Sequence, residues 1–223
     1  MLIVTEKCSQ YGHPEFVVFC EDFIPESDVQ HFTSWLEKAV SAGEVFKPDE
    51  ILQTGWMINT FFEMDDGSLA LLEPDMKSFP IAWVPGVTQT LRHMRIQRDL
   101  LVSVLPFDDF DIPDIRQCAI VAEDLCADTK EFYLERTDPE AKSSGWFIGN
   151  LNSEIDYEDS ENVRLESLYA VVLKFPQLIM YFGLPAGVRV EITANTISIF
   201  RNGLNLEPGP DSFLKMILNG DLD

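Results

Sequence analysis

Carboxylates are the side chains of this sequence with the greatest capacity for chemistry. The densest group lies in residues 154–161, with five carboxylates in eight positions and no cation: Glu154, Asp156, Glu158, Asp159 and Glu161. Oxygen ligands at alternate positions suit calcium, although the glycine and the ordered ligand spacing of an EF-hand loop are absent. The segment is also compatible with a solvated loop in which Ser160 caps a following helix and Glu161 lies near its positive end.

A third interpretation makes the same segment a docking surface for a cationic protein. Protein interfaces favour large aromatic anchors, which Tyr157 and Trp146 can supply beside the carboxylates. The candidate partner-binding residues are therefore Trp146, Glu154, Asp156, Tyr157, Glu158, Asp159 and Glu161. The sequence alone leaves the three interpretations open.

Groups that usually carry catalysis are sparse. The three histidines, His13, His31 and His93, are far apart in sequence, and the chain has no H-E-x-x-H, C-x-x-C, G-x-S-x-G or glycine-rich phosphate loop. We therefore expect no catalytic residues, no cofactor and no metal ion. An enzyme with a divalent metal held by Asp156 and Glu158 is the minor alternative.

The cysteines and arginines favour structural roles. Cys8, Cys20, Cys118 and Cys126 show neither the density nor the pairing of a disulfide scaffold, so we expect reduced thiols that are mostly buried. The eight-residue spacing of Cys118 and Cys126 suits two buried apolar side chains better than zinc ligands. Because the chain has 38 carboxylates, we expect ion pairs rather than a bound phosphate for three arginines at helical spacing: Arg92, Arg95 and Arg98.

The strands and helices that position such side chains can be predicted from the hydrophobic pattern, first in the first half of the chain. A β-branched and aromatic run predicts a strand over residues 16–20, and a helix follows from Pro25 to Gly43 with apolar residues on one face. Asp65-Asp66-Gly67 between two apolar runs predicts a tight hairpin. A second helix is expected over residues 87–105.

The segment 106–114, with two prolines and four aspartates, predicts a boundary between domains at residues 1–110 and 115–223. In the second domain we expect strands at 118–122, 188–192 and 196–200, a turn at Asn202-Gly203, and an amphipathic segment at 211–218. A helix is predicted from five apolar residues at helical spacing, ended by Pro176: Leu165, Leu168, Tyr169, Val172 and Leu173. The fold class is α+β, with two small mixed domains, each a sheet flanked by amphipathic helices.

Composition limits the partners. With 16 Lys+Arg against 38 Asp+Glu, the net charge is −22, shared by both halves of the chain. Such a polyanion does not bind nucleic acid through phosphates or lie on an anionic membrane surface. With 46% hydrophobic residues the chain is globular, and the absence of a signal-like or membrane-spanning run leads us to expect a cytoplasmic location.

The second half resembles bacterial immunity protein family thirty-three over about residues 115–190. The resemblance rests on the order of three motifs: Cys118-Ala119-Ile120-Val121, Ser144-Gly145-Trp146, and the segment from Leu168 through Pro176 and Ile179 to Pro185-Ala186-Gly187. The family usually carries an acidic residue where this chain has Phe175, so no role of that carboxylate transfers here. Residues 1–110 lie outside the resemblance.

The resemblance implies a non-catalytic protein that binds and neutralises a cognate toxin. The family recurs in polymorphic-toxin and type VI secretion loci, and the two-domain arrangement is similar to that of a pseudomonad type VI immunity protein that guards against a nuclease effector. A cationic nuclease is the partner that a polyanionic inhibitor suits best. The alternative is an acidic scaffold or regulatory protein-interaction domain without a toxin partner.

Overall fold

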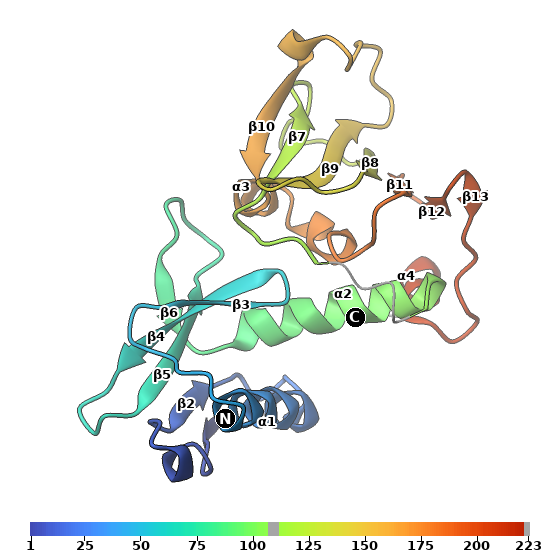
Figure 1. Cartoon of the computed structure of the whole chain (residues 1–223). Coiled ribbons are helices and arrows are strands. Elements are labelled where there is room, and N and C mark those ends of the chain that lie inside the picture. The colour runs from blue at the N-terminus through green and yellow to red at the C-terminus, as the bar shows by residue number, and fades with distance from the viewer. Residues whose placement is uncertain (107–111, 221–223) are drawn as a thin grey trace. The chain divides into compact units, whose positions relative to one another are not determined.

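The computed structural model describes residues 1–106 and 112–220. The chain divides into two compact units, Met1–Met94 and Arg95–Asp223, and the division falls within helix α2 (Thr88–Val104) (Figure 1). Most of the predicted boundary at 106–114 lies outside the described residues, so the domain limits 1–110 and 115–223 stay a prediction. No helix in the described ranges is long and apolar enough to cross a bilayer.

Unit 1 is built on a mixed six-stranded sheet. Its strands run in the order β1-β2-β5-β4-β3, with β6 also paired to β5, and only the β2–β5 pair is parallel. The strands are β1 (Leu2–Val4), β2 (Phe16–Phe19), β3 (Ile51–Thr54), β4 (Met57–Glu63), β5 (Leu69–Pro74) and β6 (Trp83–Pro85). The hairpin predicted at Asp65-Asp66-Gly67 is confirmed, since β4 and β5 pair antiparallel across it and Gly67 has a φ of 81°.

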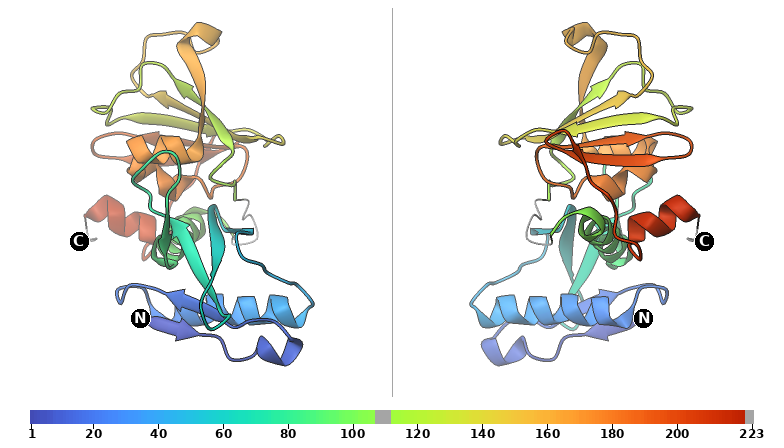
Figure 2. Two further views of the ribbon diagram at one scale, coloured as in Figure 1. Left: turned by 90° about the vertical axis from the view of Figure 1, so that its left-hand side faces the viewer. Right: turned by 90° about the vertical axis from the view of Figure 1, so that its right-hand side faces the viewer.

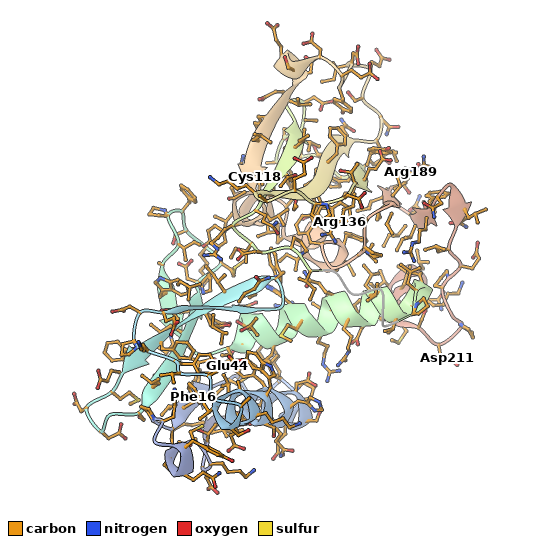
Figure 3. The ribbon with its side chains drawn as sticks, in the orientation of Figure 1. Phe16, Glu44, Cys118, Arg136, Arg189 and Asp211 are labelled. Atoms are coloured by element: carbon orange, nitrogen blue, oxygen red, sulfur yellow. The ribbon has the colours of Figure 1, made fainter. Side chains whose placement is uncertain are left out.

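Helix α1 (Glu26–Ser41) covers one face of this sheet, as its apolar spacing predicts. Val29, Leu36 and Val40 are buried against a core that includes Phe16 of β2 (Figure 3). The turn after β1, which contains the short 3-10 helix η1 (Ser9–Tyr11), is held by Glu15. The Glu15 carboxylate accepts hydrogen bonds from the hydroxyl of Thr5 (2.6 Å) and from two backbone N–H groups.

Helix α2 begins beside a buried carboxylate. The two Glu73 oxygens accept hydrogen bonds from the backbone N–H groups of Gln89 (3.0 Å) and Thr90 (2.7 Å). These are donors that a helix start leaves without intrahelical partners, so Glu73 satisfies them from β5. Burial raises the pKa of Glu73, against the opposing effect of these hydrogen bonds.

Unit 2 is built on a seven-stranded sheet in the order β10-β7-β9-β8-β11-β12-β13, in which only the β7–β9 pair is parallel. Its strands are β7 (Cys118–Ala122), β8 (Phe132–Arg136), β9 (Ser143–Asn150), β10 (Val163–Ser167), β11 (Val188–Ile192), β12 (Ile197–Arg201) and β13 (Leu204–Asn205). The predicted strands at 118–122, 188–192 and 196–200 and the turn at Asn202-Gly203 are confirmed. The α+β class is confirmed in both units, which combine sheets with helices.

One face of the unit 2 sheet is covered by helix α3 (Leu168–Lys174) and the 3-10 helix η4 (Pro176–Tyr181) (Figure 2). Phe175, between the two helices, packs edge-on against Phe132 of β8, with ring centroids 5.3 Å apart. Helix α3 ends at Lys174, two residues before Pro176, as predicted, and Pro176 is the first residue of η4. We call this covered side the inner face and the opposite side the outer face.

The predicted helix beginning at Leu165 is wrong at its start. Leu165 lies in strand β10, and α3 begins only at Leu168, where the Ser167 hydroxyl accepts a hydrogen bond from the N–H of Ala170. The first turn of the predicted helix is therefore a strand paired with β7.

The C-terminal amphipathic segment forms helix α4 (Phe213–Asn219). It is tied to the second part of α2, because the Ser103 hydroxyl accepts a hydrogen bond from the N–H of Leu214 and the Ser103 carbonyl accepts one from Gly209. Gln97 of α2 also donates to the carbonyl of Ile179 in η4. Residues 95–104 of α2 are thus integrated into unit 2.

Candidate functional site

Two acidic loops lie together at one end of the unit 2 sheet. The N–H of Leu151 donates to the carbonyl of Glu131 (3.3 Å), and the N–H of Glu123 donates to the carbonyl of Asn162 (2.9 Å). We call residues 123–131 and 151–162 the acidic end. It contains nine carboxylates, and its only Lys or Arg is Lys130.

Within the acidic end, the aspartates and glutamates differ in what they contact. Asp156 and Asp159 each accept a hydrogen bond from a backbone N–H two residues further on, from Glu158 (2.9 Å) and Glu161 (3.0 Å). The side chains of Glu154, Glu158 and Glu161 are exposed and form no ion pair within the described part of the chain. Asp156 and Asp159 therefore shape the loop, whereas these three glutamates leave their charge available to a partner.

Ser160 does not cap a helix, which corrects the solvated-loop interpretation. Residues Ser160–Asn162 form a single 3-10 turn (η3) capped by Asp159, and the chain then continues as strand β10. As for the calcium interpretation, no group of three or more His, Cys, Asp or Glu side chains in residues 1–106 and 112–220 is arranged to hold a metal ion.

Tyr157 fastens the acidic end to the sheet. Its ring packs on Phe147 with centroids 5.2 Å apart and lies over Gly149, where a Cβ would come within 3.0 Å of the ring. Its hydroxyl donates toward the Asp124 carboxylate (3.1 Å) and accepts from the N–H of Asn150 (3.1 Å). Burial raises the pKa of Tyr157. The half-buried ring is thus an anchor of the loop and leaves only part of its surface to a partner.

Trp146 is not available as a surface anchor, and this part of the predicted site is wrong. Its side chain is 1% exposed and points to the inner face, where the ring packs against Phe182 with centroids 5.7 Å apart. The guanidinium of Arg136 lies 5.8 Å from the ring centroid. A contact with a partner at this position would require opening the core of unit 2.

The Ser144-Gly145-Trp146 triplet has a structural explanation. The Ser144 hydroxyl donates to the carbonyl of Cys118 (2.9 Å), and the Ser144 carbonyl accepts from Nε of the buried Arg136 (3.0 Å). Gly145 has a φ of 78°, the left-handed region that favours glycine. The triplet therefore joins β7, β8 and β9 and places Trp146 in the core.

Sequence reasoning missed Arg136. It occupies the inward register of β8 after Phe132 and Leu134, and it is 1% exposed. Its Nη1 donates to the carbonyl of Leu184, which ties the strand to the segment before β11. The sequence signal that could have identified Arg136 is its place two residues after Leu134, at the next inward position of a strand whose inward residues alternate with outward ones.

An apolar row on the outer face borders the acidic end. The strand register places Leu165 of β10 beside Ile120 of β7, and Ile120 beside Phe147 of β9. Leu165 is 73% exposed and Ile120 is 42% exposed. We call Leu165, Ile120 and Phe147 the outer apolar row. Because Tyr157 packs on Phe147, this row is continuous with the acidic end.

The charges on the inner side of β10 are neutralised within the unit. Glu166 accepts a hydrogen bond from Lys174 of α3 (2.7 Å) and contacts Arg164, which also pairs with Glu123 (2.9 Å). Burial alone raises the pKa of Glu166, but the contacts with Lys174 and Arg164 outweigh burial, so its pKa is lowered. Glu123 is thus the member of the acidic end that Arg164 neutralises, whereas Glu158 and Glu161, close to β10 in sequence, form no ion pair among the described residues.

The remaining predicted residues have mixed outcomes. Arg98 of α2 forms an ion pair with Asp99 (2.7 Å), as expected, whereas ion pairing of Arg92 and Arg95 stays a prediction. All four cysteines are free thiols, but only Cys8 and Cys20 are buried, and burial raises the pKa of Cys8 to about 11. Cys118 is half-buried and Cys126 is exposed, so the prediction that this pair is buried is wrong.

Unit 2 is therefore an α+β domain whose candidate site is an acidic surface beside exposed apolar side chains. Residues 98–201 match the family model of the Imm33-like domain. The match confirms the resemblance seen over about residues 115–190 and extends it at both ends, while leaving just over half of the chain unmatched. No curated protein and no solved structure matches the chain.

Proposed function

We propose that this chain is an immunity protein that binds a cognate toxin stoichiometrically and neutralises it in the cytoplasm of the cell that makes both. The observation that carries the proposal is the Imm33-like domain over residues 98–201. Inhibition by binding needs no catalytic group in the inhibitor, which agrees with the sparse catalytic inventory of the sequence.

The proposed partner is a nuclease effector of a type VI secretion system, and the acidic end is the proposed contact. A nuclease grips a polyanion and must expose cationic surface to do so. The net charge of −22 steers such a partner toward this chain over long distances. The exposed glutamates of the acidic end then lie where a docked cationic surface can replace their water.

The first experiment uses the toxin encoded beside this gene, purified as a catalytically dead variant. Calorimetric titration should show a one-to-one complex, and co-expression of this chain should rescue cells from the active toxin. Failure of both binding and rescue would refute the proposed function.

The second experiment isolates the contribution of the acidic end. In the triple variant Glu154→Gln, Glu158→Gln and Glu161→Gln, the association rate should fall by about tenfold at low salt, because electrostatic steering is weakened at the docking surface. The matched control neutralises three exposed glutamates of unit 1: Glu21→Gln, Glu44→Gln and Glu63→Gln. Equal effects of the two triple variants would mean that only the total charge matters and that the acidic end is not the contact.

A further inference from the structure

Strand β10 is an open edge of the unit 2 sheet. The N–H of Glu123 donates to the carbonyl of Asn162, and the N–H of Leu168 donates to the carbonyl of Gln117. In an antiparallel pair, residues alternate between facing the partner strand and facing away from it. Arg164 and Glu166 therefore direct their backbone groups to β7, whereas Val163 and Leu165 direct theirs to the free side.

This edge lacks the devices that usually protect an exposed strand. Proteins blunt their edges with very short strands, prolines, bulges or charges. The other edge of this sheet, β13, has only two residues, whereas β10 has five residues in unbroken register with β7 and no proline. The charged side chains of β10 are engaged on its inner side, and the outer side presents Leu165.

The charges around this edge select its occupant. The acidic end directly precedes β10, and its exposed Glu154, Glu158 and Glu161 form no ion pair among the described residues. A second copy of this chain would bring another acidic end and another net charge of −22 to the same edge, which like-charge repulsion opposes. An extended segment with basic side chains is favoured by the same charges.

We propose that a strand of the cationic toxin adds to the free edge of β10 and extends the seven-stranded sheet. In this β-augmentation, the backbone groups of Val163 and Leu165 bond the added strand, which supplies affinity largely independent of its sequence. Its apolar side chains lie over the outer apolar row, and its basic side chains lie beside Glu158 and Glu161. The inference rests on the proposed function and adds the docking mode.

The test compares two leucines at the two edges of the same sheet. Leu165 and Leu204 are 73% and 72% exposed, so Leu165→Lys and Leu204→Lys make the same chemical change at an open and at a blunted edge. Lysine on an edge strand opposes strand addition. Leu165→Lys should weaken binding of the catalytically dead toxin by about tenfold or more, whereas Leu204→Lys should stay within about twofold of the wild type.

Hydrogen exchange gives a readout that side-chain loss alone does not move. In the free protein, the amides of Arg164 and Glu166 should be protected and those of Val163 and Leu165 should exchange freely. In the complex, the amides of Val163 and Leu165 should become protected. Circular dichroism and thermal unfolding check that Leu165→Lys is folded, and Leu165→Thr, which keeps a high strand propensity, replaces it if it is not.

The outcomes separate this inference from the proposed function. If the toxin does not bind the wild-type protein, both fail. If it binds wild type and Leu165→Lys equally and the two amides gain no protection, strand addition is refuted while the immunity function stands. If the protein alone is a dimer that Leu165→Lys dissociates, the edge belongs to a second copy and the proposal is also overturned.

Discussion

Gly145 of the Ser144-Gly145-Trp146 triplet permits a precise test of how unit 2 is held together. Its φ is 78°, and a Cβ at this position would lie 2.2 Å from the carbonyl oxygen of Thr137. The N–H of Thr137 donates to the carbonyl of Gly145 (2.9 Å), so the two backbones are fixed to each other. In Gly145→Ala the methyl group must displace backbone, which cannot turn away as a flexible side chain can.

The expected cost follows from these contacts and from a control with the same backbone angle. Gly203 also has a φ of 78°, but nothing lies within 4 Å of its ideal Cβ. Gly203→Ala should therefore cost only the left-handed penalty of about 1 kcal/mol. Gly145→Ala should carry the same penalty and also the cost of displacing the strand and weakening the Thr137 hydrogen bond. The free energy of unfolding should therefore fall by about 3 kcal/mol or more.

Urea-dependent hydrogen exchange is the suitable assay, because a chain with two units need not unfold in one transition. The amides of β9 report the free energy of opening of unit 2, and those of β4 report unit 1 in the same sample. The two alanine variants should differ by about 2 kcal/mol at β9 and leave β4 unchanged. Equal losses at β9 would show that the close approach to Thr137 does not determine the need for glycine.

Three further predictions concern single contacts. Ser167→Ala should destabilise unit 2 by about 1 kcal/mol in urea unfolding by removing the α3 cap, whereas Ser160→Ala should be nearly neutral. Burial alone raises the pKa of Glu15, but the hydrogen bonds that its carboxylate accepts outweigh burial and lower the pKa to about 2. The stability that ionised Glu15 gives unit 1 is therefore present above its unfolded pKa of about 4.5 and is lost as the pH falls from 4.5 to 2. Glu15→Gln should remove that part of the pH dependence of unit 1 unfolding, and an unchanged slope would contradict it. Tyr157→Phe should speed hydrogen exchange of the Asn150 amide, because this amide donates to the hydroxyl that the variant lacks. Unaltered exchange would show that the Tyr157 hydroxyl does not hold the loop.

Elements with a single dominant pattern were predictable from sequence. The apolar face of α1, with Val29 and Leu36, and the Asp-Gly hairpin before β5 depend on contacts close in sequence. The alternation of Val188 and Val190 with polar residues likewise identifies β11, because one face of that strand is buried. In these segments the local pattern and the tertiary contacts agree.

The error at Leu165 arose where two patterns overlap. Leu165 has the helical spacing to Leu168 and Tyr169, but Val163, Leu165 and Ser167 also alternate along a strand. Pairing with β7 along five residues decides for the strand, and no local feature of the sequence encodes that pairing. Only Ser167 marks the true start of the helix, as its cap.

For the candidate site, the exposure of the carboxylates was predictable from the sequence, but the positions of the apolar side chains were not. The carboxylates of residues 154–161 are exposed, as a docking surface requires, and that stretch contains no Lys or Arg. Trp146 was predicted to be a surface anchor and Leu165 to lie on the apolar face of a helix, but the tryptophan is buried and the leucine is exposed. Which side of a strand faces the core depends on register, and residue type alone does not reveal it.

The residues that carry the family resemblance and those proposed to carry binding therefore overlap only at Ile120. Ser144, Gly145 and Trp146 join strands and fill the core, so their presence identifies a fold and not a partner. Recognition of a particular toxin has to depend on exposed groups such as Glu158 and Leu165, which the resemblance does not specify. It follows that Gly145→Ala should lower stability and reduce toxin binding only through the unfolded fraction. Leu165→Lys should instead reduce binding at unchanged stability, and measuring both quantities for both variants separates the scaffold of unit 2 from its docking surface.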